Sequence, residues 1–199
     1  MSKFLLFILL AYLIGSIPTG FIIVKLFKNI DIRTVGSGST GATNVKRVMG
    51  KNWFFIVMIL DAIKGALPVI LATLFVSKFS NIGLCPVLAA IAVILGHSKS
   101  IFLNFTGGKS VASGVGTILA LNWQVGLMVF LIWSIIAWFS KYISLASMIA
   151  LLLSPILMYL FKQPIAYILY TLLGAIYIVY LHRENISRLI KGNENKVRD

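Results

Sequence analysis

Long apolar segments, separated by short polar ones, are the feature that most constrains how this chain folds. The segments occupy about residues 4–27, 53–76, 83–95, 111–138, 144–161 and 164–181. A helix needs ~20 apolar residues to cross the hydrocarbon core of a bilayer. Because 59% of the 199 residues are hydrophobic and only 12% are charged, little remains for a separate soluble domain. We therefore expect an all-α, polytopic membrane protein that forms one domain over residues 1–199.

The segment at 111–138 is longer than one span needs and is interrupted by Asn122-Trp123-Gln124. It fits either one overlong helix or a hairpin of two short helices. The hairpin gives seven spans and, with the amino terminus outside, puts fourteen of the eighteen Lys and Arg residues inside. Those left outside are Lys3, Lys78 and Lys162, and Lys64 lies within the membrane. Since Lys and Arg concentrate on the cytoplasmic side, we predict seven transmembrane helices, an outside amino terminus and a cytoplasmic carboxy terminus.

Two of the apolar segments contain residues that are unusual in a membrane helix. Pro18 should bend the first helix, because proline removes one backbone hydrogen bond. Asp61 and Lys64 lie three apart, on one face of the second helix. Charges inside the bilayer either belong to a functional site or neutralise each other between helices, and both interpretations stand for this pair.

The segment Gly36–Asn44 combines three glycines, two serines, two threonines and an asparagine in nine positions. Glycines let backbone N–H groups converge on an anion, so this composition is typical of a phosphate-binding loop, although a flexible linker would have a similar one. The spacing matches the P-loop of nucleotide triphosphatases except that Ala42 replaces the lysine, which argues against that class. Positive charge would have to come from Lys46, Arg47 or Lys51. A short helix over residues 44–50 would direct its amino end at the loop.

Gly107-Gly108-Lys109 forms a second glycine turn with a cation. The topology places both glycine segments, together with Ser144 and Ser147, at the inner membrane surface. Two anion-binding loops beside an apolar bundle indicate two phosphate-bearing ligands, one of which can carry an acyl chain. The sequence therefore points to lipid synthesis.

The last helix should continue past Leu181, because His182, Asn185 and Arg188 recur every three residues and so share one polar face. This face could reach a ligand at the inner surface. A basic amphipathic helix end can also serve only as an anchor at the membrane surface, and that alternative stands for Arg183.

Other features narrow the function further. The net charge of +13 could suggest nucleic acid, but no soluble basic domain carries it, so we expect no nucleic-acid partner. Cys85 is the single cysteine, which excludes an internal disulfide and a cysteine-based metal cluster. With only His97 and His182 and five acidic residues, we expect no metal site and no cofactor.

Four segments, GSGSTGATNVKR, GHSKSIFLNFTGGKSVAS, YISLAS and HRENISRLIKG, closely resemble those of the bacterial acyl-phosphate:glycerol-3-phosphate acyltransferases of the plasma membrane. The resemblance covers essentially the whole chain. It implies seven spans in the bacterial inner membrane and an active site at the cytoplasmic face. It also implies transfer of a fatty acyl group from acyl phosphate to the sn-1 hydroxyl of glycerol 3-phosphate, the first step of phospholipid biosynthesis, giving lysophosphatidic acid and phosphate.

The resemblance further implies which residues act. It assigns the acyl-phosphate loop to Ser37, Gly38, Thr40, Gly41, Thr43 and Asn44. It assigns glycerol 3-phosphate binding to Arg47, Lys109, His182 and Asn185, with Ser147 a looser match. Thr43, Asn44 and His182 are the candidate catalytic residues. Positions 39 and 40 read Ser-Thr where the family commonly has asparagine and a branched apolar residue. We expect membrane lipids around the protein and no obligate protein partner.

An acyl phosphate is already activated, so no nucleophilic side chain with a paired base is required. The other class of glycerol-3-phosphate acyltransferase uses a His-x-x-x-x-Asp pair. Here His97 is followed five residues later by Phe102, and His182 by Ser187, which excludes that class. Either His182 or the donor phosphate can accept the proton of the attacking hydroxyl, and the resemblance favours the phosphate. An anion transporter and a lipid-binding protein without turnover are the alternative functions.

Overall fold

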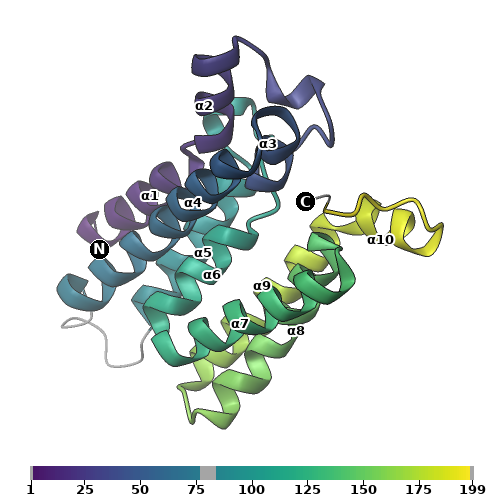
Figure 1. The fold of residues 1–199 in the computed structure, drawn as a ribbon. Helices are drawn as coiled ribbons and strands as arrows, with labels where there is room; N and C mark the ends of the chain where they lie inside the picture. Colours follow the sequence, from purple (N-terminus) through teal and green to yellow (C-terminus); the bar gives the residue numbers. More distant parts are fainter. Residues whose placement is uncertain (1, 77–83, 198–199) are drawn as a thin grey trace.

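All regular secondary structure in the described part of the chain is helical (Figure 1). A computed structural model describes residues 2–76 and 84–197, except for the side chains of residues 2, 3, 75 and 76. The α-helices are α1 (Ser2–Ser16), α2 (Thr19–Lys28), α3 (Ala42–Met49), α4 (Lys51–Leu71), α5 (Leu84–Ser98), α6 (Val111–Leu121), α7 (Trp123–Ser140), α8 (Ile143–Leu160), α9 (Ile165–Leu181) and α10 (Arg183–Ile190). A π-helical turn, Ala72–Val76, extends α4. The prediction of an all-α fold is therefore confirmed for these residues.

Four helical segments in the described ranges are long and apolar enough to cross a membrane. They are Phe4–Lys28, Lys51–Leu74, Trp123–Ser140 and Ile143–Leu160. Counting α9 with α10 as one bent pair raises the number to five, whereas α5 and α6 are apolar but shorter. Each predicted apolar segment thus contains a helix. The lengths and composition of the helices support four or five membrane spans, so the number of seven spans remains a prediction. Lys78 and Gly83, which entered that prediction, lie outside the described residues.

The segment at 111–138 forms the predicted pair of helices. Asn122 adopts an extended backbone between α6 and α7, and its side chain accepts a hydrogen bond from the Val125 N–H at 2.9 Å. This is the usual way in which an asparagine begins a helix, since it satisfies one of the N–H groups that have no partner inside it.

The prediction of a continuous last helix is wrong, because α9 and α10 meet at a bend of 61°. The bend lies at His182, whose N–H is shared between the carbonyl oxygens of Ile178 and Val179 at 3.1 and 2.9 Å. Its ring Nδ1 also lies 2.8 Å from the Ile178 oxygen. These contacts tighten the last turn of α9, so that α10 leaves the bundle sideways (Figure 1).

The helices pack in groups that bring distant parts of the sequence together. Helix α1 packs on α5, α4 on α6, and α8 on both α7 and α9. The pair α4–α6 approaches especially closely, because a side chain at Gly65 would overlap the backbone of Ser113 and one at Gly116 would overlap that of Ala62. Small residues allow such close backbone contact between membrane helices. As a result, α3, the turn that follows Gly107, and α10 gather at one end of the molecule (Figure 1).

The structure identifies the partner of Asp61. Its carboxylate lies 2.8 Å from the Lys64 ammonium, and both side chains are buried. The carboxylate also accepts a hydrogen bond from the Thr19 hydroxyl, at the first residue of α2. Lys64 donates to the carbonyl oxygen of Ile17 at 2.6 Å, within the break between α1 and α2. The predicted bend at Pro18 is therefore a complete break between two helices, α1 and α2, and the ion pair connects them.

Candidate active site

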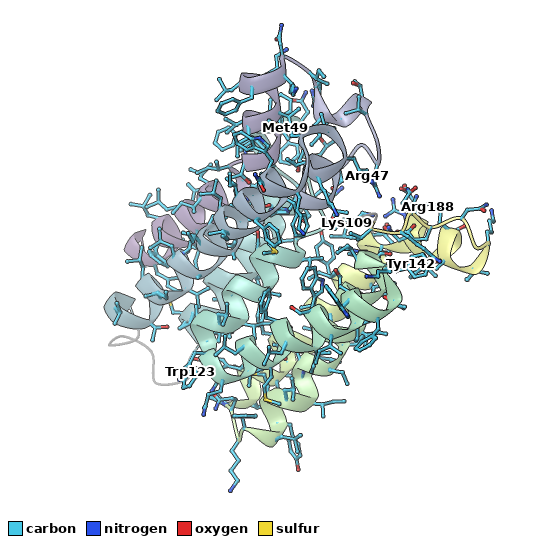
Figure 2. The ribbon with its side chains drawn as sticks, in the orientation of Figure 1. Arg47, Met49, Lys109, Trp123, Tyr142 and Arg188 are labelled. Carbon is cyan, nitrogen blue, oxygen red and sulfur yellow. The ribbon has the colours of Figure 1, made fainter. Side chains whose placement is uncertain are left out.

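A cavity of about 1450 Å³ lies where α3, the 107–110 turn, the α7–α8 turn and α10 converge. Its polar end is lined by Ser37, Ser39, Gly41, Thr43, Asn44, Lys46, Arg47, Lys109, Ser144, Ser147, His182, Asn185 and Glu194. Figure 2 shows Arg47, Lys109 and Arg188 together at this end, with Trp123 at the opposite end of the molecule. The cavity therefore collects most of the residues that the sequence assigned to the site, including Ser147 on α8. Gly38 and Thr40 do not line it.

The other part of the cavity is apolar and runs between three helices. It is lined by Met58, Ile59 and Ala62 of α4, by Val115 and Leu119 of α6, and by Leu127, Phe130 and Trp133 of α7. Such a lining suits a hydrocarbon chain. One continuous space thus connects a polar, cationic end to an apolar groove.

Asn44 organises the glycine-rich loop. Its Oδ1 accepts a hydrogen bond from the Ser37 N–H at 2.9 Å, and its Nδ2 donates to the carbonyl oxygens of Ile32, Val35 and Ser39 at 3.2, 3.0 and 2.9 Å. The side chain is only 1% exposed. Since these contacts use both ends of the amide, the geometry favours a role for Asn44 in shaping the loop. Direct contact with substrate stays a prediction.

The loop depends on glycine at Gly36, which has a φ of +61°. Residues with a side chain rarely adopt this left-handed conformation. A Cβ at this position would also overlap Oδ1 of Asn44. The loop then enters α3 at Gly41, and the first N–H groups of a helix have no partner within it, so this end of α3 favours an anion.

Arg47, Lys109 and Arg188 form a cation cluster at the polar end. Burial lowers the pKa of Lys109, and the positive charge of Arg188 lowers it further. Burial also lowers the pKa of Arg47; Glu194 opposes this effect and Arg188 adds to it. The ammonium of Lys109 donates a hydrogen bond to Oδ1 of Asn185. Mutually repelling cations in a partly buried site are stabilised when a multivalent anion binds.

Glu194 belongs to this cluster, although the sequence gave no reason to single it out. Its carboxylate accepts hydrogen bonds from Ser144 Oγ, Asn185 Nδ2 and Arg188 Nε at 2.8, 2.6 and 2.7 Å. Burial opposes ionisation, but these three donors and the charge of Arg188 hold its pKa below the usual value. Glu194 lies in the segment after α10, which reverses direction at Gly192 with a φ of +69°.

His182 and Ser147 are both buried and both line the cavity. Burial lowers the pKa of His182 to about 4, so its imidazole is neutral at pH 7. The contact between Nδ1 and the Ile178 oxygen assigns the ring proton to Nδ1, which leaves Nε2 as an acceptor. Ser147 Oγ donates to the Ile143 carbonyl at 2.8 Å and accepts from Trp133 Nε1 at 3.1 Å. One lone pair of this hydroxyl is still available to a ligand.

Known proteins match this chain over nearly its whole length. The family model described as glycerol-3-phosphate acyltransferase matches residues 5–192. This chain belongs to the glycerol-3-phosphate acyltransferase family. A glycerol-3-phosphate acyltransferase of Nostoc sp. (strain PCC 7120) is 47% identical, over 96% of this chain and 90% of that protein. A relative from Prochlorococcus marinus (strain MIT 9301) is 46% identical over 97% of both chains.

Solved structures show the same architecture. The crystal structure of PlsY (YgiH), an integral membrane glycerol 3-phosphate acyltransferase, in its glycerol 3-phosphate form matches with a TM-score of 0.92 and 37% identity. The match covers 98% of this chain and 96% of that one. The lysophosphatidic acid form of the same enzyme gives a TM-score of 0.89.

We expect Glu194→Gln to lower the stability of the protein through the loss of charge-assisted hydrogen bonds, which are each worth roughly 1.5–3 kcal/mol. Because the pKa of Glu194 is lower in the folded protein than in the unfolded chain, its contribution is present above the unfolded value of 4.5. The contribution disappears as the pH falls through the folded value. Thermal unfolding in detergent should therefore show a deficit at pH 7 that shrinks on acidification.

Glu184→Gln is the matched control for this experiment. Glu184 is an exposed carboxylate in the first turn of α10, the helix that precedes the segment of Glu194. Its removal changes the net charge equally but breaks no hydrogen bond to Asn185 or Arg188. Equal melting temperatures for the two variants at pH 7 would contradict the role given to Glu194.

Proposed function

We propose that this protein transfers a fatty acyl group from acyl phosphate to the sn-1 hydroxyl of glycerol 3-phosphate and releases lysophosphatidic acid and phosphate. The observation that carries the proposal is the single cavity that joins an anion-binding loop, a cation cluster and an apolar groove. The acyl chain would lie in the groove between α4, α6 and α7. Its phosphate end would then meet the glycine-rich loop at the polar end.

In this proposal the loop binds the phosphate of the donor. Ser37 and Thr43 line the cavity, and the free N–H groups at the start of α3 add donors without side-chain charge. Gly38 and Thr40 act through the backbone of the loop rather than through a lining side chain. Asn44 keeps the loop in shape, so that its donors are fixed before the substrate arrives. Preorganised donors of this kind stabilise the charge that develops in a transition state.

The acceptor phosphate would bind to Arg47 and Lys109, with Asn185, His182 and Ser147 around the glycerol. Arg47 can bind a phosphate through two parallel hydrogen bonds, whereas Lys109 acts as a point charge. The Nε2 of His182 is an acceptor, so it can receive a hydrogen bond from a glycerol hydroxyl. This half of the site therefore recognises both the charge and the hydroxyl groups of the acceptor.

The reaction then requires no covalent enzyme intermediate. The sn-1 oxygen attacks the carbonyl carbon, the bond between that carbon and the phosphate oxygen breaks, and the hydroxyl proton passes to the departing phosphate. With a pKa of about 4, His182 is a weak base, which favours the phosphate as proton acceptor and leaves His182 to orient the hydroxyl. Catalysis would come mainly from holding the two substrates in line.

Purified protein tests this proposal directly. We expect release of phosphate from palmitoyl phosphate that depends on glycerol 3-phosphate, and lysophosphatidic acid as the product. Because direct transfer needs both substrates bound, double-reciprocal plots should intersect and no phosphate burst should occur without acceptor. Turnover with acyl-coenzyme A but not with palmitoyl phosphate would refute acyl phosphate as the donor. A labelled acyl group trapped on Ser37 would show that transfer is covalent.

Lys109→Ala and Arg47→Ala should each raise KM for glycerol 3-phosphate by roughly 10- to 150-fold, as expected for one charge-assisted bond to phosphate. Arg47→Lys should recover only part of the loss, because lysine lacks the planar guanidinium. Lys162→Ala removes an exposed cation that does not line the cavity and serves as the control. Unchanged KM values in both cavity variants would refute the assignment of the acceptor site.

We also propose that the chain lies in the bacterial plasma membrane with seven spans, an outside amino terminus and a cytoplasmic active site. The support is the gathering of Arg47, Lys109 and Arg188 at one end of the bundle (Figure 2). In a background without Cys85, cysteines replacing the exposed Lys51 and Lys191 should react with a membrane-impermeant maleimide only from the cytoplasmic side. A cysteine replacing Lys162 should react only from outside. Labelling of all three from one side would refute this topology.

A further inference from the structure

We propose that the buried Asp61–Lys64 pair positions both substrate sites of the proposed reaction. One link leads to the donor loop, which is the glycine-rich segment Gly36–Asn44. The other leads to the acceptor turn, which is the 107–110 turn that carries Lys109. Asp61 and His97 line the same cavity as the residues of the polar end and of the apolar groove. Through Asp61 the pair therefore borders the space in which both substrates would bind. This inference rests on the proposed function.

The link to the donor loop passes through the first turn of α2. The Thr19 hydroxyl donates to Oδ1 of Asp61, and the Lys64 ammonium donates to the Ile17 carbonyl at 2.6 Å. These bonds fix both sides of the break at Pro18. The next residue, Gly20, lies so close to the loop that a Cβ there would overlap the carbonyl oxygen of Thr40. A shift of α2 would therefore displace the loop.

The link to the acceptor turn passes through His97. Nδ1 of His97 lies within hydrogen-bond distance of Ser113 Oγ, at 3.1 Å. It also packs against Oδ1 of Asp61 at 3.8 Å, which is a contact rather than a hydrogen bond. The His97 carbonyl accepts a hydrogen bond from the Gly108 N–H at 3.1 Å, and the imidazole fills the space that a Cβ at Gly108 would need. Lys109 follows directly in the chain. The orientation of this imidazole therefore fixes the turn that presents Lys109.

The two links lead to different substrates, so they can be tested separately. Thr19→Val removes the bond to α2 and keeps the shape of the side chain. It should raise KM for the acyl donor roughly fivefold, about 1 kcal/mol at 1.4 kcal/mol per factor of ten, and leave KM for glycerol 3-phosphate unchanged. Ser113→Ala releases His97 and should show the opposite pattern. The double variant Asp61→Asn/Lys64→Met leaves no unpaired charge and should raise both KM values.

Two substitutions of the same kind provide matched controls. Thr171 and Ser154 are also buried, but among the residues that the structure describes their hydroxyls bond only to carbonyls of their own helices, α9 and α8. Thr171→Val and Ser154→Ala should leave both KM values within twofold of wild type, whatever they do to stability. This separates positioning from a general loss of folding.

The outcomes are distinct. A wild-type protein that fails to acylate glycerol 3-phosphate with any donor refutes the proposed function. An active wild type in which Thr19→Val and Ser113→Ala lower the melting temperature but leave both KM values unchanged overturns this inference alone. Equal rises of both KM values in each single variant would also overturn it, since they would show no separate links. If the double variant fails to fold, the single variants still decide, because each removes one neutral hydroxyl.

Discussion

A membrane interior offers no water to an unpaired backbone group, and this constraint governs where the chain can leave the helical conformation. The chain leaves the helical conformation near Pro18, and there the Lys64 ammonium donates a hydrogen bond to the Ile17 carbonyl. A buried ammonium needs a counterion, which Asp61 provides at 2.8 Å. The ion pair thus follows from the helix break, and the break allows α2 to bring the glycine-rich loop to the end of the bundle.

The sequence was sufficient to predict the long apolar segments as helices, because apolar runs bounded by polar residues determine both their existence and their approximate ends. The hairpin at Asn122 could be predicted for the same reason. The division of the first segment into α1 and α2 was predicted only as a bend. The bend at His182 could not be predicted, since a repeat of three residues fits one straight helix equally well and the deciding contacts are made by one histidine with the preceding turn. Local periodicity gives the face of a helix but not its direction relative to the next one.

The residues of the candidate site show a similar division. The predicted topology put Arg47, Lys109, His182 and Asn185 on one membrane face and the family resemblance assigned them to one site, and the structure places all four at one cavity. The sequence could not distinguish a side chain that faces the cavity from one whose polar atoms are used inside the loop, as those of Asn44 are. Glu194 was missed because its importance comes only from its three donors. In a basic carboxy-terminal segment, a single acidic residue carries no pattern of its own.

The charges of the cavity explain why an acidic residue can belong to an anion-binding site. Arg47, Lys109 and Arg188 repel one another, and Glu194 offsets part of that repulsion while it bonds to Arg188 and Asn185. Through Asn185 the carboxylate also fixes which amide atom faces Lys109, since Nδ2 is used by Glu194 and Oδ1 is left for the ammonium. The cations are therefore held in place before a phosphate enters. Little reorganisation is then needed when it binds, which is the condition under which fixed charges contribute most to catalysis.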